Sequence, residues 1–220
     1  RTTNGIDIQI QIYTEENATL TRFLPIDERI KIINVKAKNS LNIAQLASQR
    51  LLEQHKEYDI LAYMEDDIRI EDPEFFEKVL YFHKELPEEY TVIPHRCEII
   101  ENKGDVILSG DCNRIREDLF WDTREEIGIK WTTGLKNLYR ASNPHSGCFF
   151  ISKNQANKIH DIWKSRKWER KFQLSGPLEQ AASGRLIETL KIMKPDPKQY
   201  RFFMVRHQDD IWKRHKFENE

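Results

Sequence analysis

The sequence predicts an α/β fold in which helices cover both faces of a mixed, mostly parallel sheet. Apolar runs of strand length alternate with amphipathic segments of helix length from residue 6 to residue 205. The 220 residues are 39% apolar, which is sufficient for one sizeable core. No repeat, low-complexity tract or linker divides the chain, so we expect a single domain over residues 1–220.

The first half of the chain alternates between strand and helix patterns. Isoleucines at every second position from Ile6 to Ile12 indicate a strand with one wet face. The predicted elements that follow are a strand at 30–35, a helix at 41–54, a buried strand at 60–64 and a helix that starts at Asp72-Pro73-Glu74. That start combines a capping residue, a proline and an early acid, which are typical of helix N-termini.

The second half contains a stretch with weak periodicity, residues 110–145, which we interpret as an excursion from the core. Around it we predict a strand at 90–94, a hairpin over 99–108, a strand at 148–151, a helix from 152 to about 163, a helix from 176 to 190 and a strand at 200–205. Ser152 and Gln155 have the spacing of a capping box, and Gly176-Pro177 is a typical helix start.

Composition and absent motifs argue against several classes of function. The formal net charge is −1, so global charge predicts no nucleic-acid binding. The sequence has no glycine-rich dinucleotide or phosphate loop, no zinc-protease helix and no nucleophile elbow. These absences argue against dehydrogenases, kinases and serine hydrolases.

The three cysteines, Cys97, Cys112 and Cys148, fit neither a disulfide framework nor a zinc motif. Reduced thiols are the simplest interpretation, although one disulfide with one free thiol also fits the count. We therefore expect a cytoplasmic protein. An anchor ahead of Arg1 would instead place the chain in the Golgi or ER lumen.

Aromatic residues outside the predicted core have two interpretations each. Trp131 could stack on a sugar ring or pack in the core. Residues 158–172 mix basic and aromatic side chains, which predicts either peripheral contact with an anionic membrane or a solvated helix face followed by a basic loop.

Three consecutive acids, Glu65, Asp66 and Asp67, follow the buried strand at 60–64. Adjacent carboxylates at the end of a buried strand repel one another and lose hydration. A divalent cation would offset both effects, since hard cations bind carboxylate oxygens. The pattern therefore predicts a metal site at the carboxyl end of a strand, where open α/β sheets hold ligands. A solvated acidic turn before Asp72 is the alternative.

Three further features could complete such a site. His145, Ser146 and Gly147 lead into a predicted strand, and a glycine there permits close approach of a ligand to the backbone. Glu179 lies in the first turn of its helix, where the dipole favours an ionised carboxylate that can act as a general base. His207 follows the last predicted strand, and a neutral imidazole suits Mn²⁺. An ordinary turn, a helix-start acid and a surface histidine are the structural alternatives.

The order of these features resembles that of GT-A-fold glycosyltransferases. That superfamily carries an Asp-x-Asp-type metal motif, a glycine-containing loop, an acidic catalytic motif and a C-terminal histidine, in this order. The segment 38–47 and the strand into the acidic triplet also resemble the approach to that metal motif. The similarity spans roughly residues 6–207, and the family-two-like and exostosin-like branches are the nearest.

The resemblance implies a GT-A-like αβα sandwich and a specific set of roles. The activity would be transfer of a sugar from a UDP- or GDP-linked donor to a glycan or other hydroxyl acceptor, with inversion favoured by a single base. The implied roles are Asp67, Glu65 and His207 as ligands of Mn²⁺ or Mg²⁺, Glu179 as general base, and Glu65, Asp66, His145, Ser146 and Gly147 as donor- or acceptor-binding residues, with Trp131 as a candidate platform for a sugar. The chain departs from the pattern where Gln180, rather than a second acid, follows Glu179.

Two other functions remain open at this point. A nucleotidyltransferase of related fold would need a glycine-rich, basic loop for a triphosphate, and residues 14–29 contain no glycine. A non-catalytic carbohydrate- or protein-binding module is the second alternative. The acidic triplet, Glu179 and His207 argue against a decayed site.

Overall fold

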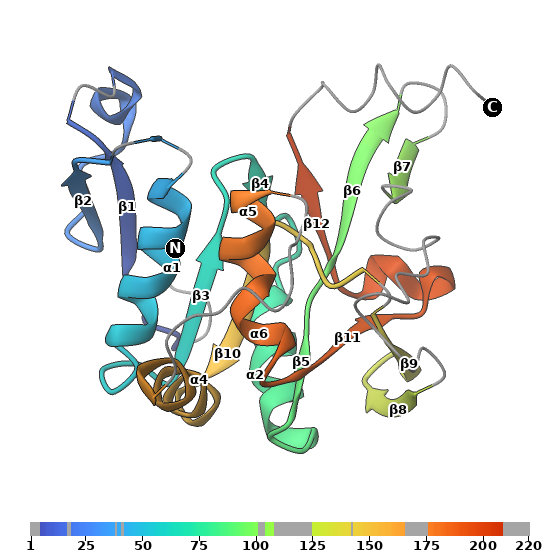
Figure 1. The fold of residues 1–220 in the computed structure, drawn as a ribbon. Helices are drawn as coiled ribbons and strands as arrows, with labels where there is room; N and C mark the ends of the chain where they lie inside the picture. The colour runs from blue at the N-terminus through green and yellow to red at the C-terminus, as the bar shows by residue number, and fades with distance from the viewer. Residues whose placement is uncertain are drawn as a thin grey trace.

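The structure, a computed structural model, describes residues 5–16, 19–37, 39–40, 42–100, 104–107, 125–141, 143–165 and 176–208. These residues form a mixed α/β fold in which helices pack beside several small sheets (Figure 1). Cys97 and Cys148 are buried, and no disulfide joins them in the described part of the chain, while Cys112 lies outside the described residues.

The N-terminal part pairs two strands in parallel, β1 (Ile10–Glu15) and β2 (Ile30–Val35), with the 3₁₀ helix η1 (Thr19–Phe23) between them. Helix α1 (Asn42–Glu53) follows. The prediction is confirmed for β2 and α1. The first strand lies later than the predicted 6–12, because its pairing with β2 begins at Ile10.

The centre of the fold is the antiparallel pair of β3 (Ile60–Met64) and β10 (Cys148–Ser152), both predicted by their apolar runs. Helix α2 (Phe75–Glu85) follows β3, and α4 (Lys153–Ser165) follows β10. The predicted capping box is confirmed, since the Ser152 N–H donates to Gln155 Oε1 at 3.1 Å and the Gln155 N–H donates to Ser152 Oγ at 3.2 Å.

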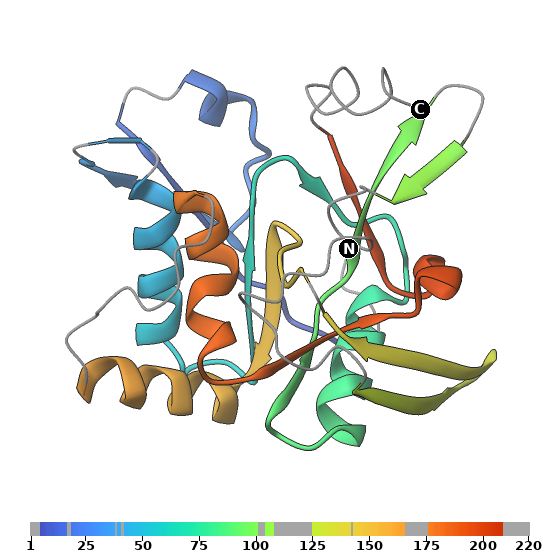
Figure 2. The same cartoon turned by 45° about the vertical axis from the view of Figure 1, so that its right-hand side comes forward.

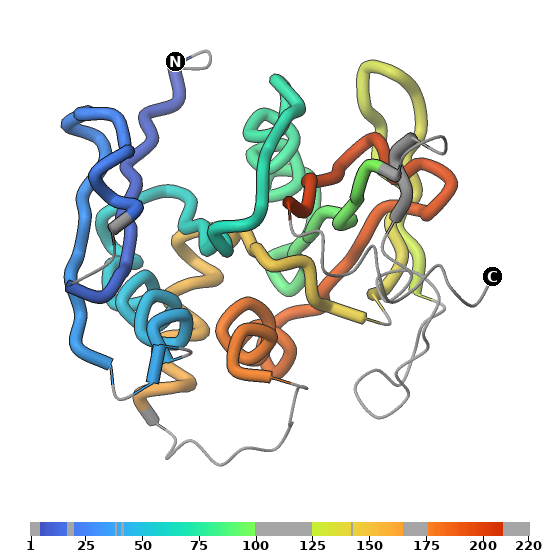
Figure 3. Tube along the Cα trace, turned by 90° about the horizontal axis from the view of Figure 1, so that it is seen from above, coloured from blue at the N-terminus to red at the C-terminus, as the bar shows by residue number. Residues whose placement is uncertain are grey.

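A continuous helical segment covers 177–187 and is made of α5 (Pro177–Glu179), the π turn η2 (Gln180–Gly184) and α6 (Arg185–Ile187). The prediction of a helix starting at Gly176-Pro177 is confirmed, with Gly176 as the N-cap. Viewed from above, this segment lies beside α1 (Figure 3).

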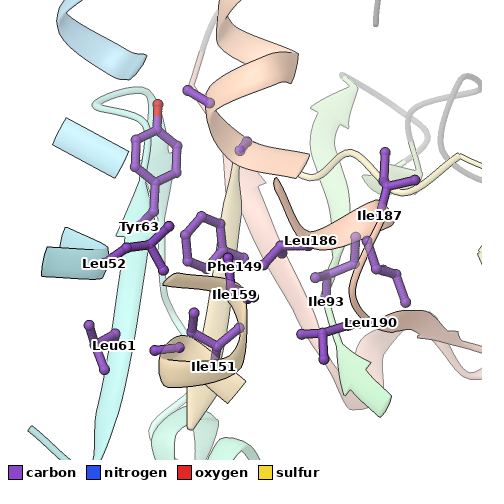
Figure 4. Close-up of a cluster of buried hydrophobic side chains, with 14 of the residues drawn as sticks. Leu52, Leu61, Tyr63, Ile93, Phe149, Ile151, Ile159, Leu186, Ile187 and Leu190 are labelled. Atoms are coloured by element: carbon purple, nitrogen blue, oxygen red, sulfur yellow. The ribbon is translucent and has the colours of Figure 1, made fainter. Parts of the chain in front are cut away.

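Strand β10 is buried on both faces. Phe149 and Ile151 belong to one apolar cluster, and Cys148 and Phe150 belong to another. The first cluster, shown in Figure 4, joins Leu52 of α1, Leu61 and Tyr63 of β3, Ile159 of α4 and Leu186 of α6. Figure 2 shows these helices on one side of the β3–β10 pair and α2 on the other. This part of the fold therefore has three layers.

Two four-stranded sheets complete the described structure. The first has the order β5 (Tyr90–Val92), β11 (Lys191–Pro195), β9 (Gly134–Arg140), β8 (Glu126–Trp131). The second has the order β4 (Ile68–Arg69), β12 (Met204–His207), β6 (His95–Ile100), β7 (Gly104–Ile107).

Several predicted boundaries were wrong in this second half. The hairpin β6–β7 begins at His95, not residue 99, because β6 also pairs with β12. The first half of the predicted strand at 200–205 belongs to the 3₁₀ helix η3 (Pro197–Phe202), and β12 starts only at Met204. The side chain of Asp196 caps η3 by accepting from the Lys198 N–H, and Pro197 occupies its first turn.

The expectation of a mostly parallel sheet is also wrong for the described residues. Five of the eight strand pairings are antiparallel, and three are parallel. The two hairpins, β6–β7 and β8–β9, account for part of this difference. Strand β10 adds to it, because it returns antiparallel to β3 after the excursion that precedes it.

Candidate functional site

The acidic triplet lies at the carboxyl end of β3, beside the loop that enters β10. The Glu65 N–H donates to the carbonyl of Gly147 at 2.8 Å, which extends the β3–β10 ladder by one step. Asp66 is exposed, whereas Glu65 and Asp67 are partly buried. Two of the predicted features, the triplet and the glycine loop, are therefore neighbours in space.

His207 reaches the same place from the end of the described chain. Strand β12 pairs antiparallel with β4, which puts His207 opposite Ile68. The Gln208 N–H donates to the carbonyl of Asp67 at 2.8 Å. As a result, Nε2 of His207 lies 3.2 Å from Oδ2 of Asp67. The structure brings these two predicted metal ligands into contact, although their role as ligands stays a prediction.

Glu98 is a third member of this cluster, and the sequence analysis missed it. Strand β6 runs parallel to β12 in a register that pairs Cys97 with Arg206, so Glu98 lies beside His207. Nδ1 of His207 is 3.0 Å from Oε1 of Glu98, and both side chains are almost fully buried. The available signal was a pair of charged residues, Arg96 and Glu98, two positions apart and directly before Ile99 and Ile100.

Burial and mutual charge shift the protonation of this cluster. Burial, with a smaller contribution from the charge of Asp67, raises the pKa of Glu65 to about 7, against the opposing influence of Arg96. A hydrogen bond with His207 lowers the pKa of Asp67, although burial alone would raise it. Burial alone would lower the pKa of His207, but its hydrogen bonds with Asp67 and Glu98 raise it. Near neutral pH the cluster therefore carries less negative charge than its acids would carry in water.

Each of the three acids has one buried oxygen without a hydrogen-bond partner in the described part of the chain: Glu65 Oε1, Asp67 Oδ1 and Glu98 Oε2. In folded proteins such atoms are uncommon, and an ion or a water molecule often accounts for them. Hard divalent cations take carboxylate oxygens as ligands. The donor set thus fits the chemistry of Mn²⁺ or Mg²⁺.

The described side chains would supply only some of the ligands of a metal ion. Among the described residues, no group of three or more His, Cys, Asp or Glu side chains is arranged to hold a metal ion. However, two adjacent ligands of an octahedral ion with bonds of about 2.1 Å lie about 3 Å apart. The 3.2 Å separation of Asp67 and His207 is close to this value. The Asp67 side chain is 34% exposed, so water and a bound phosphate could reach an ion there.

Only glycine fits at position 147, for two reasons. Its φ of +64° is in the left-handed region, which side chains other than glycine rarely adopt. A Cβ atom there would also lie 2.9 Å from Oε2 of Glu65 and 3.0 Å from Cδ1 of Ile68. In the structure, the group that closely approaches the backbone at Gly147 is the carboxylate of Glu65.

The rest of the loop is held by buried hydrogen bonds. The hydroxyl of Ser146 is fully buried and donates to the carbonyl of Pro94 at 2.5 Å. Nζ of the buried Lys194 donates to the carbonyl of His145 at 2.9 Å. In this conformation the side chain of Ser146 fixes the loop, so a direct contact between its hydroxyl and a donor sugar stays a prediction.

Glu179 lies in the first turn of α5, as predicted. Its carboxylate folds back over the start of the helix and lies against Gly176. A Cβ atom added to Gly176 would be only 2.5 Å from Oε2 of Glu179. The charge of Glu179 contributes to the raised pKa of Glu65. The proposed base is therefore within electrostatic range of the acidic cluster.

Trp131 has a packing role in the structure. Its ring lies 5.0 Å from that of Tyr81 and 5.9 Å from that of Phe202, both edge to face. Lys78 approaches the same ring. These contacts favour the core interpretation over the sugar platform.

The basic segment 158–172 is described only as far as residue 165. Within α4, Lys158 and Lys164 are exposed, while Ile159 is fully buried. No helix in the described ranges is both long and apolar enough to cross a membrane. Peripheral contact through this segment stays a prediction.

Comparison of the chain with protein-family models, with curated proteins and with solved structures finds no match.

Proposed function

We propose that this protein is a metal-dependent glycosyltransferase with a GT-A-like fold. The observation that carries the proposal is the contact between Asp67 and His207 at the carboxyl end of β3. The unpaired buried oxygens of Glu65, Asp67 and Glu98 support it, since they favour a bound cation. The three-layer packing around β3 and β10 is compatible with the proposed αβα sandwich.

The proposed substrates are a UDP- or GDP-linked sugar and an acceptor with a free hydroxyl. A divalent cation bound by Asp67 and His207, with Glu65 beside it, would neutralise the diphosphate as the bond to the sugar breaks. Arg96 adds a permanent positive charge, which opposes the rise in the pKa of Glu65 and adds to the lowering of the pKa of Asp67. The exposed carboxylate of Asp66 is available to accept hydrogen bonds from the ribose.

Glu179 is the proposed general base. It would take the proton of the acceptor hydroxyl while that oxygen attacks the anomeric carbon. It lies in the first turn of α5, at the start of the helical segment that packs beside α1. A single base of this kind favours inversion at the anomeric carbon.

A thermal-shift assay tests the proposal directly. We expect Mn²⁺ together with UDP or GDP to raise the melting temperature, and either component alone to have a smaller effect. Asp67→Asn should abolish the combined effect. Asp59→Asn, at the opposite end of β3, is the matched control and should retain it.

No stabilisation of the wild-type protein by any metal and nucleotide pair would contradict the proposed function. That result, combined with binding of a free glycan, would favour the non-catalytic carbohydrate-binding module instead.

A further inference from the structure

Glu98 is a buried acid whose only hydrogen bond, within the described chain, is with His207. Its Oε1 is 3.0 Å from Nδ1 of the imidazole, and its Oε2 has no partner. The side chain of Glu98 is 2% exposed, so water does not solvate this carboxylate. Burying a carboxylate with a single hydrogen-bond partner is energetically unfavourable. The contact with His207 therefore calls for a functional explanation.

We propose that Glu98 is a positioning residue that holds the neutral imidazole of His207 with Nδ1–H toward Glu98 and the lone pair of Nε2 toward Asp67, whereas the protonated ring donates to both acids. In this orientation Nε2 is prepared to bind a divalent cation together with Asp67. The orientation follows from the geometry alone, whereas its use for a metal rests on the proposed function.

The backbone fixes which nitrogen faces which acid. Strand β12 lies between β4 and β6, so His207 has Asp67 on one side and Glu98 on the other. Nε2 is 3.2 Å from Asp67, and Nδ1 is 3.0 Å from Glu98. With a side chain that is 3% exposed, His207 has little room to turn its ring over.

The two acids differ in what they can do without the imidazole. A carboxylate oxygen accepts hydrogen bonds, so a hydrogen on the nitrogen that faces Glu98 gives this buried group its one partner among the described residues. Losing that hydrogen would leave Glu98 with no partner in a buried position. Asp67 is 34% exposed and can accept from water instead. When the neutral imidazole has one hydrogen, that hydrogen therefore belongs on Nδ1.

This arrangement is one that metal sites use. A histidine ligand binds through a lone pair, and a carboxylate on its other nitrogen fixes the tautomer and strengthens the donor. A purely structural Glu98–His207 pair would select the same tautomer, because Nδ1–H donates to Glu98 in either case, but it would not affect a cation at Asp67. The tautomer therefore tests the orientation, and the affinity for Mn²⁺ is the readout that separates the two roles.

The experiment uses the full chain and three variants. Glu98→Met removes the acceptor at similar size, and Glu98→Gln keeps an amide oxygen that can accept from Nδ1. Glu71→Gln is the matched control, because Glu71 pairs with Arg206, the neighbour of His207, at 2.9 Å and does not contact the imidazole. ¹⁵N NMR of the metal-free protein reports the tautomer of neutral His207, and calorimetry with Mn²⁺ alone reports affinity.

We expect neutral His207 to carry hydrogen on Nδ1 in the wild type, in Glu98→Gln and in Glu71→Gln. Glu98→Met should lose this preference and bind Mn²⁺ about 10- to 100-fold more weakly. Glu71→Gln should match the wild type in both measurements.

Wild-type His207 with hydrogen on Nε2 would overturn the proposal, even if Glu98→Met does not fold. A folded Glu98→Met variant with unchanged tautomer or unchanged Mn²⁺ affinity would overturn it as well. If wild-type protein shows the Nδ1–H tautomer but binds no Mn²⁺, the positioning role stands and the proposed function fails.

Discussion

Two buried polar residues, Gln155 and Glu98, are each 1% exposed as whole residues but differ in how their side chains are hydrogen-bonded. The amide of Gln155 donates to the carbonyls of Glu88 and Tyr90 at 2.9 and 2.7 Å and accepts from the Ser152 N–H at 3.1 Å. Glu98 has one partner, His207, and an unpaired oxygen. The first side chain ties α4 to the strand β5, whereas the second completes no secondary structure.

The difference separates structural from functional polar groups. A fully paired buried amide stabilises the fold and leaves nothing to bind a ligand. Unpaired oxygens on Glu65, Asp67 and Glu98 reduce stability, and a bound cation would recover it. We therefore expect substitutions at the acidic cluster to change ligand binding and substitutions near Gln155 to change stability.

The largest effect is expected on catalysis, through Glu179, the proposed base near the acidic cluster. Glu179→Gln should lower the turnover of sugar transfer by about 100- to 10,000-fold, because the amide cannot take the proton of the acceptor. Donor binding, measured by calorimetry with Mn²⁺ and the nucleotide, should be unchanged. Near-normal turnover would show that the base lies elsewhere.

Gly147→Ala should reduce the free energy of unfolding by about 2–4 kcal/mol, since it combines a positive φ with crowding of Glu65 and Ile68. Gly134→Ala is the matched control, because Gly134 has a φ of +102° but open space around its Cβ position. Urea denaturation should show a smaller loss for the control. Equal losses would mean that contact with Glu65 does not constrain residue 147.

Gln155→Leu should reduce the free energy of unfolding by about 2 kcal/mol, because the carbonyls of Glu88 and Tyr90 lose a donor. Its affinity for Mn²⁺ should remain that of the wild type. A clear loss of affinity in a folded variant would show that the fold and the site cannot be separated in this way.

The pH dependence of stability gives the smallest effect. The raised pKa of Glu65, about 7, means that the folded protein retains a proton which the unfolded chain releases near its ordinary value of 4.5. Metal-free stability should therefore fall as pH rises from about 4.5 to 7, by on the order of 1 kcal/mol after allowance for the partial exposure of Glu65.

His207 acts in the same direction at higher pH. Its raised pKa favours folding below 6.5, and this contribution is lost as pH rises through the folded-state value. Glu65→Gln should flatten the decline between pH 4.5 and 7, as measured by urea denaturation at several pH values. An equally steep decline in that variant would refute the role assigned to Glu65.

Local patterns predicted the parts of the fold that local forces determine. The apolar runs that end at polar residues fixed the bounds of β2 and β3, and the Ser152–Gln155 spacing identified the start of α4. The strands β8, β9 and β11 were missed. Ile127, Ile129 and Trp131 of β8 do alternate with other residues, but the interpretation of 110–145 as an excursion from the core overlooked this signal. The apolar residues of β9 and β11 do not alternate, and β11 pairs with β9 across a long stretch of sequence.

The candidate site also combines residues that local motifs predict with residues that only long-range pairing brings together. The acidic triplet, Gly147 and His207 were visible as motifs, and the structure brings them together at one strand end. Glu98 and Arg96 were missed because only the register of β6 with β12 places them there. For Trp131 the sequence left packing and sugar binding open, because no sequence signal separates them, and the ring contacts with Tyr81 and Phe202 favour packing.

The most direct test of the central claim is pulsed EPR of Mn²⁺ added to the protein. If one cation binds between Asp67 and His207, the spectrum should show coupling to an imidazole nitrogen, and His207→Gln should remove that coupling. Mn²⁺ that binds without any nitrogen coupling, or that does not bind at all, would contradict the account.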